Sequence, residues 1–306
     1  MTIDFAKLMS DLRHEGNSRV ALVCAEEVDA LHSVMQAHAN GLAEPILIGE
    51  ENKIRELAGR EAIDLTGISV LNYPDPLLAC QLAVQMVREG KAEAIMKGMV
   101  KTSIILKAVL NKETGIRSNK LLSHIAIFTL PVLGRSLLIT DAALNIAPDI
   151  DTKQGILENA VEAMHLLGYD SPKVGCLCAV ENVNPAMQAT VDAAELVRRN
   201  QAGEISGCEV GGPFALDNAL FPEAAALKGV DSPVAGQSDI LLAPFIEVAN
   251  ALYKSLAFLQ GLPVAGAIIG AKAPVIISSR ADSEESKLRS IVLSLYLAKK
   301  QKELFR

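Results

Sequence analysis

The sequence predicts an α/β protein of two domains, each with a mainly parallel sheet flanked by helices. The chain has 306 residues, of which 50% are hydrophobic, and this length exceeds what a single core usually holds. Short apolar β-rich runs alternate with segments of helical period, a pattern typical of βαβ units. Two β-rich runs, 124–130 and 135–141, are joined by Pro131–Gly134 and read as a hairpin. We therefore expect the second domain to begin near residue 120.

The alternation gives an order of elements along the chain. The expected elements of the first half are strand 19–24, helix 26–40, strand 45–49, strand 68–71, helix 76–89 and strand 94–96. After the hairpin they are helix 153–167, strand 174–180, helix 185–199, strand 239–244, helix 246–259, strands 263–269 and 274–277, and a closing helix. Ligands of parallel sheets bind beyond the carboxyl ends of the strands. The polar segments after residues 96 and 277 are therefore candidate sites.

Composition narrows the class of protein. A net charge of −7 argues against nucleic acid as the main partner. The opening Met1–Lys7 lacks the pattern of a signal peptide, and the apolar run 262–271 is too short to span a bilayer, so no membrane contact and a cytoplasmic location are expected. Five cysteines without a CxxC pair fit reduced thiols. The histidines are scattered, and no metal site is expected.

The segment 278–285 leads from the last strand into the closing helix. A helix N-terminus presents free backbone N–H groups and attracts anions. Arg280 adds a planar fork of donors that matches phosphate, and Ser279 and Ser283 add hydroxyls. The structural alternative is that Asp282 is an N-cap with Glu285 three residues on, as in a capping box.

The segment Lys97–Ser103 leaves an earlier strand through a glycine and enters another helix. Lys101, Thr102 and Ser103 stand at its start, where they suit phosphate contact. Capping of the helix by Thr102 or Ser103 is the alternative.

Three motifs, in this order and spacing, resemble the phosphate acetyltransferase and phosphate butyryltransferase family. They are the segments 211–219, 250–254 and 269–285, and the likeness runs from about Lys97 to the C-terminus. The resemblance implies reversible transfer of a short-chain acyl group between coenzyme A and inorganic phosphate. It also implies a fold like that of isocitrate and isopropylmalate dehydrogenases, with the site in the cleft between the domains. The first domain would comprise 1–120 plus 272–306, and 121–271 would be inserted.

The resemblance also suggests residues for each role. It assigns catalysis to Ser279, Arg280, Asp282 and Ser283, and substrate binding to Lys101, Thr102, Ser103, Gly212, Pro213, Asp217, Asn250, Tyr253, Lys254 and Lys272. Coenzyme A is expected as a substrate, with no tightly bound cofactor, and the family leads us to expect a homodimer.

The sequence departs from the family pattern at three places. Ala249 replaces a glycine, and no arginine stands between Arg88 and Arg117, so Lys101 or Lys107 would substitute for a phosphate-binding arginine. Acetyl-specific relatives have an aspartate where this chain has Ser286, so no general base is assigned. Butyrate-type relatives share the Ser-Arg-Ala-Asp-Ser run of 279–283, which favours an acyl chain longer than acetyl.

Two other functions stay open. One is a metal- and NAD-dependent decarboxylating hydroxy-acid dehydrogenase on a similar frame, although no GxGxxG follows a strand. The other is a ligand-binding relative without activity, for which Ser286 is the best argument, because fold alone does not fix function.

Overall fold

The computed structural model describes residues 1–14, 18–277 and 282–304. It divides into two compact units. We call Asp4–Lys120 with Pro263–Arg306 the terminal unit, and Met1–Ile3 with Leu121–Leu262 the central unit. Residues 263–271 fall in the terminal unit, whereas the sequence analysis assigned them to the inserted part. It stays a prediction that the units are separate domains.

The terminal unit is an α/β unit with twelve elements among its described residues. They are α1 (Phe5–His14), β1 (Arg19–Val23), α2 (Val28–Ala39), β2 (Glu44–Gly49), α3 (Glu51–Arg60), β3 (Ser69–Asn72), α4 (Pro76–Arg88), β4 (Ala94–Lys97), α5 (Thr102–Val109), β10 (Val264–Ile269), β11 (Val275–Ile276) and α11 (Glu284–Leu304).

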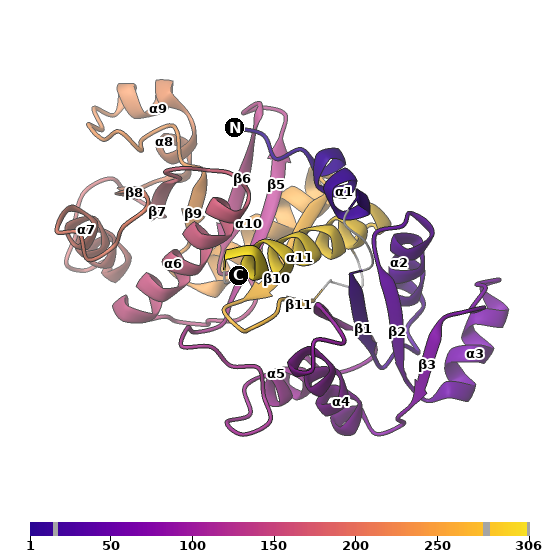
Figure 1. Cartoon of the computed structure of the whole chain (residues 1–306). Coiled ribbons are helices and arrows are strands. Elements are labelled where there is room, and N and C mark those ends of the chain that lie inside the picture. Colours follow the sequence, from indigo (N-terminus) through magenta and orange to yellow (C-terminus); the bar gives the residue numbers. More distant parts are fainter. Residues whose placement is uncertain (15–17, 278–281, 305–306) are drawn as a thin grey trace. The chain divides into compact units, whose positions relative to one another are not determined.

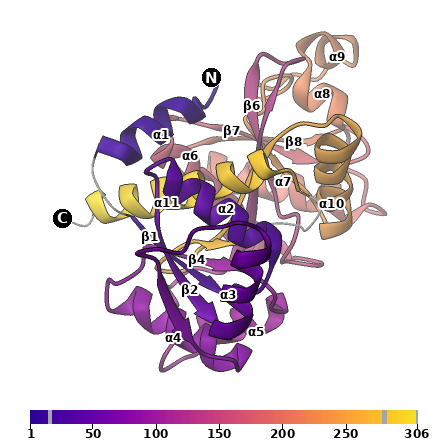
Figure 2. The ribbon, with the colours of Figure 1, turned by 90° about the vertical axis from the view of Figure 1, so that its right-hand side faces the viewer.

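Helices cover both faces of the terminal unit's sheet. The strand order is β3-β2-β1-β4-β11-β10, and all pairs are parallel except β10 with β11. The steps from β1 to β2 and from β3 to β4 run in opposite directions along the sheet, so right-handed crossovers put α2 and α4 on opposite faces. Helices α1, α2 and α11 pack together on one face, and α4 and α5 on the other (Figures 1 and 2). Because both faces are covered, strands such as β1 are apolar throughout, and Val20 to Val23 are fully buried.

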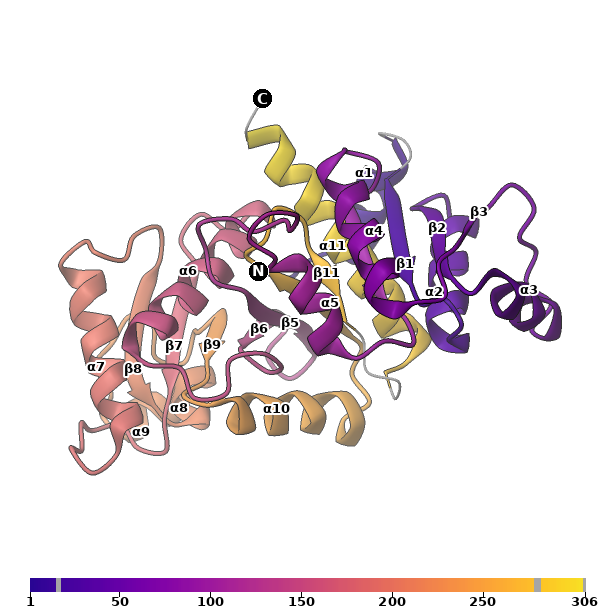
Figure 3. The same cartoon turned by 90° about the horizontal axis from the view of Figure 1, so that it is seen from below.

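The central unit combines a hairpin with parallel strands. Its elements are β5 (Ser123–Leu130), β6 (Arg135–Thr140), α6 (Ile150–Leu166), β7 (Lys173–Leu177), α7 (Gln188–Gln201), β8 (Glu209–Phe214), α8 (Leu216–Leu220), α9 (Pro222–Leu227), β9 (Ile240–Leu242), α10 (Ile246–Lys254) and the π-helical η1 (Ser255–Leu259). The order is β5-β6-β9-β7-β8, with β5 antiparallel to β6 and the rest parallel. Strands β7 and β9 lie between α6 and the helices α8 and α10 (Figure 3).

Several expected elements differ from the structure. The Gly211–Pro213 segment, where the sequence analysis expected no strand, lies inside the edge strand β8. The helix expected over 246–259 is α-helical only to Lys254 and continues as η1. Helices α1 and α3 were not predicted.

Candidate active site

Two of the candidate segments follow neighbouring strands of the terminal unit's sheet, at the carboxyl ends of those strands. Strands β4 and β11 are parallel neighbours, with Ile95 opposite Val275 and Met96 opposite Ile276. The chain therefore emerges from both strands side by side at their carboxyl ends. Ser279 and Arg280 follow β11 but lie outside the described residues.

The segment after β4 is pressed against the end of β1. The N–H groups of Gly98 and Met99 donate to the carbonyls of Val23 and Cys24 at 2.9 and 2.8 Å. A Cβ on Gly98 would lie 2.2 Å from the Cys24 carbonyl oxygen, so only glycine fits there. This contact fixes the backbone position of Gly98 and Met99, from which the chain continues to Lys101.

Within residues 1–14, 18–277 and 282–304, helix α5 begins without a side-chain capping bond. Lys101 is the N-cap residue, and Thr102 and Ser103 are the first two helical residues, so the capping interpretation of these hydroxyls is wrong. Lys101 and Ser103 are exposed and Thr102 is half-buried. A lysine and two hydroxyls thus surround an uncapped, positively polarised helix end, which is an arrangement that suits an anion.

Ser283 caps α11, so the structural alternative in which Asp282 is the N-cap is wrong. The Ser283 Oγ accepts the N–H of Ser286 at 3.2 Å. Glu285, the expected partner in the capping box, instead pairs with Arg289 at 2.6 Å. Asp282 is half-buried just before this cap.

Ser286, which the sequence analysis singled out as a departure from the family pattern, is a buried structural residue. Its side chain is 4% exposed, and its Oγ accepts the N–H of Val264 at 3.1 Å. One turn later, Ser290 Oγ accepts the N–H of Gly266 at 2.9 Å. The sequence analysis missed this link between α11 and β10. Its signal was the serine spacing at 283, 286 and 290.

Lys272 lies at the opposite end of the strands, before the start of β11. It precedes β11, and its N–H donates to the Ile116 carbonyl at 2.9 Å. With Arg88 and Lys302 it lines a hollow of about 220 Å³. The structure does not bring Lys272 together with the segment Lys101–Ser103.

In the central unit, α10 turns Asn250 and Tyr253 towards the hairpin. The Asn250 amide donates to the Ala142 carbonyl at 3.0 Å. The Tyr253 ring meets His124 and Phe128 edge-on, with centroid distances of 6.2 and 5.7 Å. Lys254 is exposed, with its ammonium 5.5 Å from the Phe258 ring centre. One end of α10 is thus anchored by packing, and a cation is left in solvent.

The other central-unit candidates lie around β8. Gly212 has a φ of +142°, and a Cβ there would lie 2.9 Å from the Cys176 Cβ. Gly212 and Pro213 line a hollow of about 500 Å³. Exposed Asp217 is 3.0 Å from the Lys228 ammonium, whose hydrogen bond lowers the pKa of this carboxyl. Strands β7 and β9 separate β8 from β6, so this group is apart from Asn250 and Tyr253.

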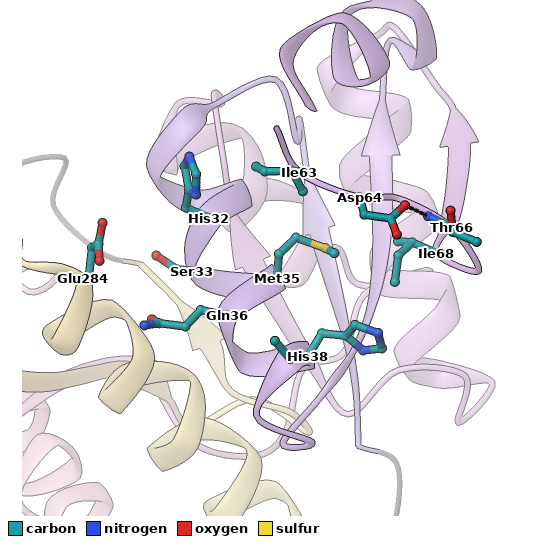
Figure 4. Close-up of a pocket in the computed structure, with 11 residues that line it drawn as sticks. His32, Ser33, Met35, Gln36, His38, Ile63, Asp64, Thr66, Ile68 and Glu284 are labelled. Atoms are coloured by element: carbon teal, nitrogen blue, oxygen red, sulfur yellow. Dashed lines mark hydrogen bonds between the residues drawn. The ribbon is translucent and has the colours of Figure 1, made fainter. Parts of the chain in front are cut away.

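A groove of about 490 Å³ runs along α2 near the start of α11 (Figure 4). Its lining includes His32, Gln36 and Glu284. None of the sequence-predicted site residues within the described part of the chain lines it. The His32 ring nitrogen is 3.3 Å from a Glu61 carboxylate oxygen.

Comparison with known proteins identifies the family. The family model described as phosphate acetyl/butaryl transferase matches residues 76–295. The chain belongs to this family. The resemblance inferred from the three motifs is thereby confirmed.

Individual members of the phosphate acyltransferase family match over most of their length. A phosphate butyryltransferase from Clostridium beijerinckii is 43% identical over 302 residues, covering 99% of this chain and 100% of the relative. The crystal structure of a branched-chain phosphotransacylase from Enterococcus faecalis matches with a TM-score of 0.79 and 33% identity, covering 92% of this chain and 99% of that one.

A more distant match concerns the fold alone. The 4-hydroxythreonine-4-phosphate dehydrogenase of Klebsiella pneumoniae has a TM-score of 0.55 at 15% identity, covering 93% of this chain and 100% of that one. The α/β fold of isocitrate dehydrogenase type predicted for this phosphate acyltransferase family member is confirmed.

Two negative findings apply to the described part of this family member. Over residues 1–14, 18–277 and 282–304, no group of three or more His, Cys, Asp or Glu side chains is arranged to hold a metal ion. Within the same ranges, no helix combines the length and apolar character needed to cross a bilayer.

Proposed function

We propose that this phosphate acyltransferase moves a short acyl chain reversibly between coenzyme A and inorganic phosphate and prefers butyryl or propionyl to acetyl. Family membership supports the reaction class. The Ser-Arg-Ala-Asp-Ser run at 279–283, shared with butyrate-type relatives, supports the longer chain, as does the likeness to a phosphate butyryltransferase.

The pairing of β4 with β11 carries the proposal. The segment with Lys101 follows β4 and the segment with Arg280 follows β11, and the carboxyl ends of these two parallel strands are neighbours. We infer that both hold the phosphate: Arg280 through its planar fork, Lys101 through charge, and Thr102 and Ser103 through hydroxyl and backbone donors at the uncapped start of α5.

Holding two anionic substrates together against their mutual repulsion is the first requirement of this reaction. A phosphate oxygen then attacks the thioester carbonyl, the carbon–sulfur bond breaks, and the thiolate of coenzyme A leaves and is protonated. The developing oxyanion needs a donor, for which Ser279 and Ser283 are the proposed groups.

Ser286 does not serve as the general base of the reverse reaction. Its hydroxyl is buried and bonded to the backbone of β10. Asp282, half-buried beside the cap of α11, is the proposed proton acceptor for the thiol.

The central-unit residues are proposed contacts for coenzyme A. The exposed ammonium of Lys254 suits its phosphates, while Asn250 and Tyr253 fix the helix that carries it. Gly212, Pro213 and Asp217 offer a second surface beside the 500 Å³ hollow. Lys272 is not included, because it precedes β11 and so lies at the end of the strands opposite to their carboxyl ends.

Phosphate-dependent thiol release tests the proposal directly. Acetyl, propionyl and butyryl coenzyme A are compared with and without phosphate and without added divalent metal. We expect release only with phosphate and faster release with butyryl or propionyl. Inactivity on all three thioesters refutes the transferase. NAD reduction with a hydroxy acid and magnesium identifies the dehydrogenase instead, and tight coenzyme A binding without turnover identifies a ligand-binding relative.

A homodimer and a cytoplasmic location are part of the proposal. Light scattering at micromolar concentration checks the first, and a monomer contradicts it.

A further inference from the structure

Three cationic side chains surround one hollow at the amino ends of strands β4 and β11. They are Arg88 in the last turn of α4, Lys272 just before β11, and Lys302 in the last turn of α11. The hollow has a volume of about 220 Å³, and its lining belongs entirely to the terminal unit. All three residues are exposed, so an anion in solution can reach their charges.

The one carboxylate in this hollow is already engaged. Among the described residues that line the hollow, Glu93 is the only acid. Its Oε1 lies 3.1 Å from the Lys302 Nζ, and its Oε2 accepts the N–H of Arg19 at 2.7 Å and lies 3.8 Å from the Arg19 Nε. Arg19 does not line the hollow, so it offsets the charge of Glu93 from outside. An excess of positive charge therefore remains inside.

Helix ends explain two of the three cations, but not the third. Arg88 and Lys302 complement the partial negative charge of helix C-termini, and Arg88 also donates to the Thr114 carbonyl at 3.2 Å. Lys272 lies in no helix. Over the described ranges its ammonium makes neither an ion pair nor a hydrogen bond. In a chain of net charge −7, an anion in the hollow supplies the counter-charge that these three cations lack.

The backbone around Lys272 is fixed without a ligand. The Lys272 N–H donates to the Ile116 carbonyl at 2.9 Å, and the preceding Ala271 forms an antiparallel bridge with Arg117. The hollow is thus largely pre-formed, as binding sites for small molecules usually are.

The lining also indicates the class of anion. The planar fork of Arg88 matches the oxygens of a phosphate group, and two lysines add the charge that a dianion needs. A phosphate group alone takes up the room of roughly two or three water molecules, each about 30 Å³, so it leaves much of the hollow empty. Buried apolar residues line the rest: Ala92, Ile116, Ala273 and Ala298.

We propose that this hollow is a second anion-binding site, which takes a phosphomonoester with a short apolar chain. The phosphate lies among Arg88, Lys272 and Lys302, and the chain lies against Ile116. Lys272, which the family resemblance suggested as a substrate contact, thus serves a site at the opposite end of the strands from the proposed catalytic residues. This inference does not depend on the proposed acyl transfer.

Arg88→Met is the principal test. Titration calorimetry of the full chain at low ionic strength uses butyl phosphate, a stable phosphomonoester with a short chain. Wild type should bind one equivalent more than the variant, or bind that equivalent at least tenfold more tightly, because the variant lacks a charge-assisted contact. In the thiol-release assay, kcat and the KM for inorganic phosphate should change less than about twofold.

Lys272→Met gives a second variant with a different signature. It should weaken the same equivalent by a similar factor. Its melting temperature without ligand should be unchanged or higher, because it removes a cation that has no counter-charge among the described residues. Butyl phosphate should raise the melting temperature of this variant less than that of wild type.

Arg60→Met is the matched control. Arg60 stands in the last turn of α3, is exposed and does not line the hollow. It reproduces the loss of a cation at a helix end and of one unit of net charge. Its butyl phosphate binding should equal that of wild type, and weakening as large as in Arg88→Met overturns the site.

Two further ligands test the chemical class. At this site, inorganic phosphate should bind at least tenfold more weakly than butyl phosphate, because it buries no methylene groups. Butyrate, with a single charge, should bind more weakly still. Equal binding of inorganic phosphate and butyl phosphate overturns the role of the apolar lining, and equal binding of butyrate overturns the preference for phosphate.

The outcomes separate this site from the proposed reaction. Identical butyl phosphate binding in wild type, Arg88→Met and Lys272→Met overturns the site, whether or not the protein releases thiol. Loss of one bound equivalent in both variants supports the site, even for a wild type without thiol release, which would refute the transferase alone.

Discussion

The hydroxyl oxygens of Ser283 and Ser286 lie 2.9 Å apart in the first turn of α11. Ser283 caps the helix, and Ser286 accepts the N–H of Val264 from β10. The two serines thus join the start of a helix to a strand.

Ser286→Ala should lower the free energy of unfolding by about 1–3 kcal/mol, because the buried Val264 N–H loses its acceptor. Urea denaturation measures the loss. Ser294→Ala is the matched control on the same helix: the Ser294 hydroxyl is fully buried and has no hydrogen-bond partner in the described part of the chain, so its removal should cost nothing. An intact stability with a strongly reduced kcat in Ser286→Ala would show instead that Ser286 reaches the substrate.

Arg280→Lys should impair turnover strongly, because an ammonium does not reproduce the bidentate fork of a guanidinium. Loss of a charge-assisted contact of about 2 kcal/mol corresponds to about 30-fold in kcat/KM. The melting temperature should scarcely move, because exposed ion pairs contribute only about 0–1 kcal/mol. Kinetics and melting are measured on the same preparation. A lower melting temperature with unaltered kinetics would make Arg280 a structural residue.

Gly212→Ala should destabilise the central unit. The φ of +142° disfavours any side chain, and the new Cβ would lie 2.9 Å from that of Cys176. Gly203→Ala gives the cost of an ordinary left-handed backbone: Gly203 has a φ of +77° with open space around it, so about 1 kcal/mol is expected. Urea midpoints compare the two variants. Equal losses would show that neither the φ of +142° nor the contact with Cys176 adds to this ordinary cost.

Lys228→Met should make the melting temperature depend less steeply on pH in the acid range. Hydrogen bonds from Lys228 lower the pKa of Asp217 and of Glu181. The ordinary pKa values are 3.8 for Asp217 and 4.5 for Glu181. A carboxyl whose pKa is lower in the folded state stabilises the fold at pH values above its ordinary pKa, and this contribution is lost as the pH falls through the folded-state pKa. The wild-type melting temperature should therefore fall more steeply than that of the variant below about pH 4.5. Parallel curves would exclude a contribution from these pairs.

The sequence predicted the alternation of strands and helices because central parallel strands are buried on both faces. Val20 to Val23 of β1 form an unbroken apolar run for this reason, and Ser123 to Leu130 with Arg135 to Thr140 form the expected hairpin. The motifs gave the family because three weak patterns in a fixed order are specific together.

What the sequence did not predict depends on neighbours that lie far away in the chain. Ser283 rather than Asp282 caps α11, and both residue types are good caps, so local pattern does not choose between them. The strand at Gly211 and Gly212 was not predicted, because glycines are rare in strands; here Val234 and Cys176 pack so closely against the two positions that a side chain would not fit. An ion pair between Lys287 of α11 and Asp29 of α2 has no local signal, since each residue alone resembles a surface charge.

Strand β8 forms one border of the central unit's sheet, and its sequence has a consequence for behaviour at high concentration. A regular border strand can serve as a template on which a second molecule adds a strand. Pro213 lacks an N–H donor, and the register shifts opposite Gly175 to Leu177, so the ladder that β8 offers to an incoming chain is interrupted. Concentrated solutions of this protein should therefore resist growth of intermolecular β-structure from this border.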